Sequence, residues 1–183
     1  MTEKYENRRV RMTKNLMKEA LLDLMEHENI INISVTAICE AADVNRSTFY
    51  NHYKDPSELL FEIEQDLLNQ IPAPAEILDM MKHETLLAAT TGFFEYIKDN
   101  RKTVRVLFNE NNGSGFTSRL VDHIMNGYVP VDENSDDLTA HFKQLYIANG
   151  TVGMLCEWIR SDFPMSSEVI ADMMYNISKR IAY

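Results

Sequence analysis

Residues that interrupt helices are scarce in this sequence. Its 183 residues include only 6 glycines and 5 prolines. A protein made of strands needs stretches dense in Val, Ile and Thr, separated by turns that glycine and proline favour. Leu, Met, Ala, Glu and Lys, which favour helices, are abundant instead. The composition therefore predicts an all-α fold.

Long apolar runs are missing as well, and cysteines are few. No run approaches the roughly 18 apolar residues that a membrane-spanning helix needs, and the charged residues 1–18 contain no apolar stretch of the signal-peptide type. The two cysteines, Cys39 and Cys156, lie far apart within apolar helical patterns, which favours buried free thiols over a disulfide. We therefore expect a cytoplasmic protein that does not enter a membrane.

The motifs of common enzyme classes are absent from the sequence. The histidines form no HExxH or Cys-His ligand pattern, and there is no glycine-rich phosphate loop or nucleophile elbow. A scattered histidine is more often exposed or bonded within the structure than catalytic. We therefore expect no enzyme activity, no metal site and no cofactor. The five histidines are His27, His52, His83, His123 and His141.

The charge is unevenly distributed along the chain. A formal net charge of -10 argues at first against nucleic acid as a partner, but the acidic excess lies further on, as in residues 132–137. A locally basic segment can face DNA while the acidic remainder faces away, because salt screens charges beyond roughly 10 Å. An ordinary solvated amphipathic helix would explain the basic segment, residues 1–18, equally well. The basic residues of this segment are Lys4, Arg8, Arg9, Arg11, Lys14 and Lys18.

Apolar residues at helical spacing predict a first helix over about residues 8–27. Ser34 can cap a second helix over about 35–42, and a tight turn at Asp43 leads to a third over about 45–53. Two short helices joined by so brief a turn cannot pack antiparallel along their lengths. They must cross steeply, and this is the geometry of a helix-turn-helix.

A fourth helix is marked by clear start signals. Asp55 can act as its N-cap, Pro56 suits the first helical position, and Glu58 completes a capping box. The run Pro72-Ala-Pro74 then breaks the chain. We therefore divide the sequence into a helix-turn-helix DNA-binding domain, a connecting helix with its linker, and a C-terminal effector-sensing and dimerisation domain, over residues 1–54, 55–74 and 75–183.

The C-terminal part is predicted to contain five more helices, so that the chain has about nine. They fall near residues 75–98, 101–110, 114–127, 137–162 and 166–181. The last two carry more apolar surface than one small core needs, and we predict that they join two copies of the chain. The interface residues that we expect are Leu145, Val152, Leu155, Ile159, Met173, Ile177 and Ile181.

The third helix separates apolar from polar side chains. Val44, Phe49 and Tyr53 are spaced to face a core, which leaves the polar residues between them outward. Arginine can bind guanine and asparagine can bind adenine through paired hydrogen bonds, and hydroxyl groups suit phosphate oxygens. An ordinary solvated surface would hold the same residues, so this chemistry alone leaves both interpretations open. The outward set is Asn45, Arg46, Ser47, Thr48, Tyr50 and Asn51.

Residues from about Thr13 to Leu67 resemble the DNA-binding region of the TetR/AcrR family. The resemblance rests on VTAICEAADV (35–44), on STFYNHYKD (47–55) and on the Leu59–Leu60 pair. It implies a homodimer in which each subunit inserts its third helix into the major groove of a palindromic operator, as a repressor in the usual mode. With the outward Asn45, the expected DNA contacts are Thr36, Asn45, Arg46, Ser47, Thr48, Tyr50, Asn51, His52 and Lys54.

Two positions depart from the family pattern. Many members have glycine at the turn where this sequence has Asp43, and aspartate tolerates a left-handed conformation better than most residues. Many also have a phosphate-binding lysine where Pro56 stands, and proline offers neither a charge nor a backbone donor. Lys54 and the start of the fourth helix must then bind phosphate instead.

The second half resembles one branch of the family more faintly. LFNENNGSGFTSRL (107–120) and ANGTVGMLCEWI (148–159) are similar to a C-terminal domain of the branch that includes regulators near dihydroxyacetone kinase operons. This suggests dimerisation through the last two helices and leaves activation open as an alternative to repression. It does not identify a ligand.

An effector held in the C-terminal part is the expected means of control. It would alter the spacing of two DNA-binding domains that read half-sites roughly 34–36 Å apart. The alternative to a small effector is control by a protein partner. The alternative to a DNA-binding regulator is a helical interaction module that has lost DNA binding. Large apolar side chains at helical spacing are more often plain core than pocket. The expected pocket walls are Phe93, Phe94, Ile97, Leu107, Phe116, Met125, Tyr146 and Trp158.

Overall fold

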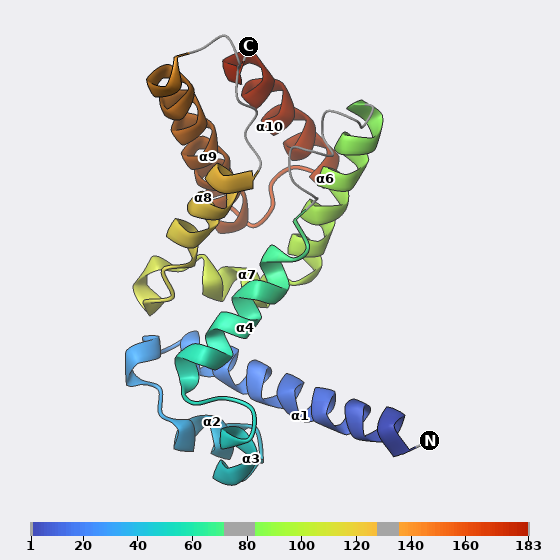
Figure 1. The fold of residues 1–183 in the computed structure, drawn as a ribbon, viewed down its shortest axis with the longest axis vertical. Coiled ribbons are helices and arrows are strands. Elements are labelled where there is room, and N and C mark those ends of the chain that lie inside the picture. Colours follow the sequence, from blue (N-terminus) through green and yellow to red (C-terminus); the bar gives the residue numbers. More distant parts are fainter. Residues whose placement is uncertain (1, 72–82, 128–135, 183) are drawn as a thin grey trace. The chain divides into compact units, whose positions relative to one another are not determined.

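The computed structural model describes residues 2–71, 83–127 and 136–182, and within these ranges the chain forms nine α-helices, two 3₁₀ turns and no strand. This confirms the predicted all-α fold (Figure 1). No helix in these ranges is both long and apolar enough to cross a membrane. The elements are α1 (Thr2–Met25), η1 (Ile30–Asn32), α2 (Val35–Ala41), α3 (Arg46–Tyr50), α4 (Pro56–Leu68), α6 (His83–Asp99), α7 (Arg101–Leu107), η2 (Glu110–Asn112), α8 (Phe116–Gly127), α9 (Asp137–Arg160) and α10 (Ser167–Ala182).

The chain divides into two compact units. The first, which we call the head, comprises Met1–Leu67 together with Asn109–Ser114. The second, which we call the body, comprises Leu68–Phe108 and Gly115–Tyr183. The chain therefore passes between the units three times, and a six-residue segment from the second half of the sequence belongs to the head.

The head has an apolar core to which four helices contribute. Met17, Leu21 and Met25 of α1 are buried, as are Ile38 of α2, Phe49 of α3 and Leu59 of α4. The repeat of three and four residues places these α1 side chains on one stripe, so burying them holds the helix against the rest of the head. The helix begins at Thr2, earlier than predicted, and ends at Met25.

The head helices start where their capping residues stand. The Ser34 hydroxyl accepts a hydrogen bond from the Ala37 backbone amide at 3.1 Å, and the Asp55 carboxylate accepts one from the Glu58 amide at 2.9 Å. Each satisfies a donor that the first turn of a helix leaves free. The predicted starts of α2 and α4 are therefore confirmed, and α4 ends at Leu68.

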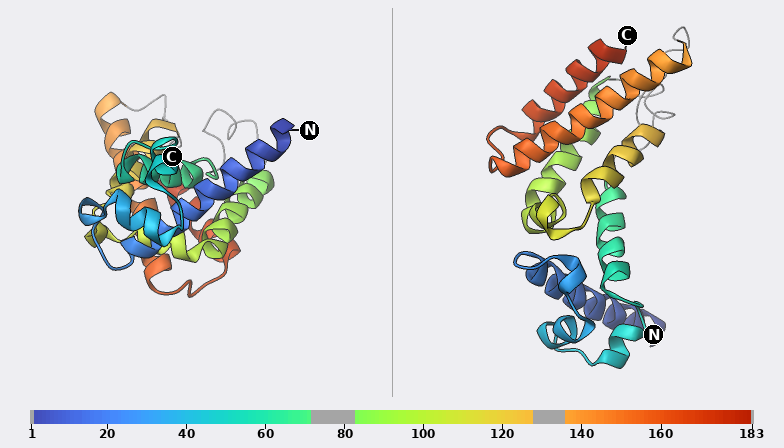
Figure 2. Two further views of the ribbon diagram at one scale, coloured as in Figure 1. Left: turned by 90° about the horizontal axis from the view of Figure 1, so that it is seen from below. Right: turned by 90° about the vertical axis from the view of Figure 1, so that its left-hand side faces the viewer.

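The body packs its helices around aromatic side chains. Helix α6 packs against α10, and α9 contacts α7, α8 and α10; Figure 2 shows α9 and α10 side by side. Trp158 lies edge-on to Phe94 at 5.4 Å and to Phe163 at 4.9 Å between ring centroids, and its indole nitrogen donates to the Met165 carbonyl at 3.1 Å. Such edge contacts add to the free energy of burial.

The predicted body helices are present with shifted ends. The helix expected over 101–110 ends at Leu107, and η2 follows in the segment that belongs to the head. Residues 75–82 of the expected 75–98 helix and the Pro72-Ala-Pro74 break lie outside the described residues. Both cysteines are free thiols, with Cys39 buried and Cys156 half-buried.

Candidate DNA-binding site

The turn between α2 and α3 uses a left-handed residue. Asp43 has φ of 51°, and the next amide, that of Val44, donates to the Cys39 carbonyl at 3.0 Å. A left-handed residue after a helix reverses the chain within few residues, and aspartate is among the side chains that tolerate it. Asp43 therefore takes the conformation that glycine would supply, as predicted from the sequence.

Asn45 organises the start of α3. Its side-chain oxygen accepts hydrogen bonds from the Thr48 amide at 2.7 Å, the Thr48 hydroxyl at 2.8 Å and the Ser47 hydroxyl at 2.6 Å. Asn45 is therefore the N-cap. Helix α3 begins at Arg46, one residue later than the predicted start at residue 45. These bonds hold both hydroxyl groups close to the first turn of the helix, whose free amides point in the same direction.

Buried aromatic residues fix the rotation of α3. Phe49 is fully buried and Tyr53 is 3% exposed, and their ring centroids lie 5.7 Å apart. Tyr50, one residue along, meets Phe49 edge-on at 5.8 Å and is 53% exposed. Because Phe49 anchors one side of the helix, the polar side chains on the other side must face outward. Val44, which precedes the helix, is half-buried.

The nine residues that we predicted to contact DNA all lie within residues 36–54 of the head. Thr36 stands in the first turn of α2, and the others lie on α3 or next to its ends. Thr48 and His52 are half-buried. The exposed members are Thr36, Asn45, Arg46, Ser47, Tyr50, Asn51 and Lys54.

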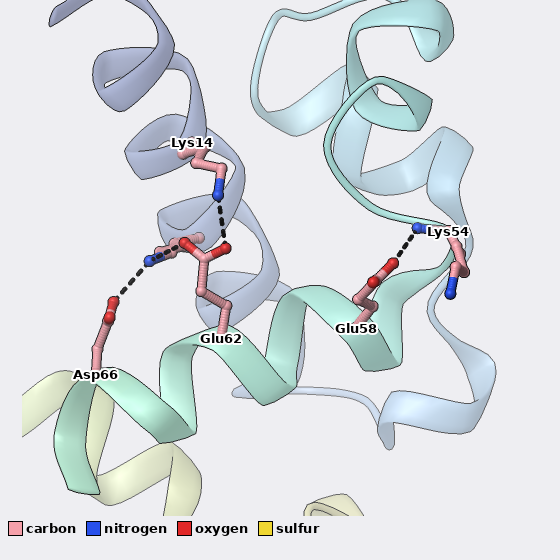
Figure 3. Close-up of polar contacts among 6 residues, drawn as sticks. Lys14, Lys54, Glu58, Glu62 and Asp66 are labelled. Atoms are coloured by element: carbon pink, nitrogen blue, oxygen red, sulfur yellow. Dashed lines mark hydrogen bonds and ion pairs between the residues drawn. The ribbon is translucent and has the colours of Figure 1, made fainter. Parts of the chain in front are cut away.

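Lys54 offers its charge to solvent. Its backbone amide donates to the Glu58 carboxylate at 2.5 Å, which fixes the main chain before α4 (Figure 3). Within the described part of the chain its ammonium group makes no ion pair, and the side chain is exposed. A lysine held at the backbone and open at its tip is suited to a phosphate oxygen.

Two lysines of the basic N-terminal segment are bound to α4. Lys14 pairs with Glu62 at 2.7 Å, and Lys18 pairs with Glu62 at 2.7 Å and with Asp66 at 2.6 Å (Figure 3). Burial alone would raise the pKa of Glu62, but hydrogen bonds from the two lysines outweigh it and lower that pKa. The positive charge available to DNA in this segment is therefore smaller than its composition suggests.

This ion-pair network was not predicted from the sequence. Lys14 also lies over the Tyr53 ring, 5.1 Å from its centroid, so the network reaches the end of the helix-turn-helix. Burial, with the negative charge of Glu62 in second place, raises the pKa of Tyr53. The available signal was a pair of lysines four residues apart on one helix and a pair of acids four residues apart on another.

The C-terminal half matches a family model. The model, described as a transcriptional regulator C-terminal region of the TetR type, covers residues 84–180, which is more than half of the chain. The chain belongs to the TetR family of transcriptional regulators. The resemblance drawn from the sequence is thus confirmed.

Solved structures of TetR-type proteins share the fold. A TetR regulator from Streptococcus agalactiae matches with a TM-score of 0.69 at 16% identity, over 96% of this chain and 98% of that one. The dihydroxyacetone kinase operon activator DhaS matches with a TM-score of 0.58 at 22% identity, over 92% of this chain and 94% of its own. The all-helical TetR architecture described for this chain therefore recurs in both.

A relative in Bacillus subtilis extends the similarity in sequence. The uncharacterized HTH-type transcriptional regulator YxbF is 26% identical over 150 residues, which is 81% of this chain. The match covers 35% of YxbF, so the chain spans about a third of that relative's length. In this TetR-family regulator, the turn at Asp43 joins α2 to α3, and the two helices contact each other as the predicted helix-turn-helix requires.

The body of this TetR-family regulator buries part of the predicted dimer interface within one chain. Val152, Leu155 and Ile159 are at most 5% exposed and belong to the core of the body. The other four residues of the predicted set reach the surface. Leu145 and Ile177 are exposed, and Met173 and Ile181 are half-buried.

Sequence reasoning missed other exposed apolar side chains on the same two helices. Leu138 and Phe142 precede Leu145 on α9 at intervals of four and three residues, a spacing that could have revealed them. An open groove of about 580 Å³ lies beside them. Its walls are Leu138, Thr139, Phe142, Lys143, Tyr146 and Ile181.

The predicted pocket walls are mostly packed core. Phe94 contacts Trp158 edge-on, and Phe116 contacts Phe108 in the same way at 5.3 Å. Tyr146 is 66% exposed and lines the α9 groove, away from this packed set. Of the remaining members, Ile97 and Leu107 are buried, and Phe93 and Met125 are half-buried.

Proposed function

We propose that this TetR-family regulator binds a palindromic DNA operator as a homodimer, through the outward face of α3. The observation that carries the proposal is the division of that helix between the buried Phe49 and the exposed Arg46 and Asn51. In the major groove, Arg46 would bind guanine and Asn51 adenine. Tyr50 and Lys54 would bind phosphates, which positions the helix without reading sequence.

The remaining predicted contacts have supporting roles at the same surface. The Ser47 and Thr48 hydroxyls lie at the start of α3 and would bind phosphate by turning their protons from the Asn45 oxygen to a phosphate oxygen, beside the free amides of the first turn. Thr36 would do the same at the start of α2. His52 is half-buried and would reach DNA only from the edge of the surface.

The homodimer would form through α9 and α10. Leu138, Phe142 and Tyr146 of α9 are each at least 60% exposed, and Ile177 of α10 is 43% exposed. A contiguous apolar surface on a folded protein favours association, and a twofold pair buries the same surface of both copies. Met173 and Ile181 extend this surface from α10.

We further propose that the regulator is a repressor, released from DNA when an effector binds the body. The second candidate is an activator, or a regulator controlled by a protein partner. The close packing of Trp158 with Phe94 and Phe163 favours control by a protein partner over control by a small ligand, since a small ligand would have to open that core. A protein with this role acts in the cytoplasm, where bacterial DNA lies.

Selection of bound duplexes from a random DNA library, followed by mass determination of the complex, tests the proposal. We expect a palindromic motif bound by two subunits or a multiple of two. The matched control is Arg46→Ala together with Asn51→Ala, which leaves Phe49, the Asn45 N-cap and the backbone hydrogen bonds of residue 51 in place. Equal enrichment by the wild-type and control proteins, or none by folded dimeric wild type at any salt, would contradict DNA reading by α3.

A further inference from the structure

A segment from the second half of the sequence is built into the head. Asn109–Ser114 belongs to the head, whereas α7 directly before it and α8 directly after it belong to the body. Asn109 caps η2 by accepting a hydrogen bond from the Asn111 amide at 3.1 Å, and the buried Asn112 accepts one from the Ser114 amide at 3.1 Å. The segment is therefore ordered by its own side chains.

Asn29, in the turn between α1 and α2, binds this segment. Its side-chain nitrogen donates to the Asn111 carbonyl at 3.2 Å, while its side-chain oxygen accepts from the Ile31 amide at 3.1 Å and so caps η1. One side chain therefore holds both η1, which leads directly into α2, and the segment between α7 and α8. Two residues separate η1 from α2. Ile33 is buried, and Ser34 is the N-cap of α2.

Gly113 makes this close approach possible. It has φ of 75°, and a Cβ atom added there would lie 2.6 Å from the side-chain oxygen of Asn29 and 2.7 Å from its nitrogen. Gly115 also has a left-handed φ, of 64°, but its Cβ would meet only the Arg119 guanidinium at 3.4 Å, an ordinary contact. Only at Gly113 does the missing side chain leave room for Asn29.

We propose that Asn29 and Asn109–Ser114 form a coupling element, which we call the asparagine clasp, between the helix-turn-helix and helices α7 and α8. A displacement of α7 or α8 acts on the clasp through the main chain, because the segment is continuous with both helices. The clasp transmits it to η1 and then to the start of α2. Coupling of this kind is reciprocal, so a change at α2 and α3 also alters α7 and α8. The DNA part of the test rests on the proposed function.

Four variants of the full-length protein separate the clasp from its surroundings. Asn29→Asp keeps an oxygen for the η1 cap but replaces the donor to Asn111 with a repelling oxygen. Asn32→Asp makes the same charge change at an exposed position in the same turn. Gly113→Ala combines left-handed strain with a clash against Asn29, and Gly115→Ala has the strain without that clash.

Hydrogen exchange measured by mass spectrometry without DNA tests the clasp by itself. We expect Asn29→Asp and Gly113→Ala to speed exchange at least about fivefold in residues 26–33, in 109–114 and in the adjoining turns of α7 and α8, since one ordinary hydrogen bond is worth about that factor. Asn32→Asp should leave all these segments unchanged, and Gly115→Ala should leave 26–33 unchanged. An effect of Asn29→Asp confined to residues 26–33 would overturn the proposal.

The same exchange measurement with the selected duplex tests transmission. When the duplex binds to wild type, hydrogen exchange should become slower in α2 and α3, and the exchange rate should also change in residues 101–127. In Asn29→Asp and Gly113→Ala the first effect should remain and the second should disappear. An equal change at 101–127 in all proteins would refute the clasp as the coupling element. If the duplex protects α2 and α3 in none of them, the proposed function fails, and the measurement without DNA still decides on the clasp.

Discussion

The head and the body of this regulator are stabilised in different ways. The head has a small apolar core under a polar framework of caps and ion pairs, such as those made by Asn45 and Glu62. The body relies on aromatic packing around Trp158, and it leaves a row of apolar side chains exposed on α9. A polar framework fixes orientation, which suits the proposed DNA-reading surface, whereas an exposed apolar face favours the proposed association with a second copy.

Phe49→Ala should have the largest effect and should unfold the head while the body stays folded. Removing a fully buried phenylalanine costs about 3–5 kcal/mol, so we expect the head to unfold and DNA binding to be lost. Trp158, the only tryptophan, lies in the body, and its fluorescence should keep its native spectrum. Tyr50→Ala, at the exposed neighbour, should retain the fold and lose affinity. A Trp158 spectrum of the unfolded type in Phe49→Ala would contradict the expectation that the body stays folded.

Phe142→Asp should break the body's proposed contact with a second copy. Phe142 is 60% exposed, so the single chain loses little, whereas a charge in a dimer interface should weaken association by about 3 kcal/mol, on the order of a hundredfold. Sedimentation at decreasing concentration measures the change. Ile31→Asp, at an 84% exposed residue of the head, is the matched control and should leave the dimer intact. A stable Phe142→Asp dimer would place the interface elsewhere.

Arg46→Ala should reduce affinity for the selected DNA by about 1–3 kcal/mol and relax the preference at one base position. Lys54→Ala should weaken binding to all sequences and reduce the salt dependence by about one unit, because one phosphate contact is lost. Competition binding over a range of salt concentrations distinguishes the two variants. Equal weakening on every sequence by Arg46→Ala would show that Arg46 binds only phosphate.

Glu62→Gln should have the smallest effect on stability. The ion pairs are partly exposed, so after solvent screening we expect a loss of about 1 kcal/mol or less. Because Lys14 and Lys18 lower the pKa of Glu62, the pairs stabilise the head above the ordinary glutamate value of 4.5, and this stability is lost as pH falls through the lowered pKa. The difference between wild type and variant in denaturant unfolding should therefore shrink in acid. A difference that grows in acid would assign the effect to another group.

The local features of the head were predicted well from the sequence. Ser34 and Asp55 cap their helices as expected, and Asp43 takes the left-handed turn. These features depend on residues two to four positions apart, so the chain itself brings the partners together. The end of α3 was placed too late because the periodicity that buries Tyr53 continues beyond the last helical residue, Tyr50.

Features that join distant residues were missed. Lys14 and Glu62 are 48 positions apart, and Asn29 and Asn111 are 82 apart. Val152 and Leu155 were predicted to be at an interface because periodicity shows that a helix has an apolar side. It does not show which part of that side the chain's own core covers. That core takes Val152 and Leu155, and leaves Leu138 and Phe142 exposed.

The sequence by itself determined the all-α class, the helix-turn-helix with its caps, and the polar face of α3, because each follows from short-range spacing and from side chains that satisfy nearby backbone groups. Only the tertiary structure decided that the two lysines bind α4, that the asparagine segment between α7 and α8 joins the head, and which apolar residues remain exposed. These depend on which surfaces meet when the helices pack. The free energy of burial selects that arrangement over the whole chain, and no local pattern encodes it.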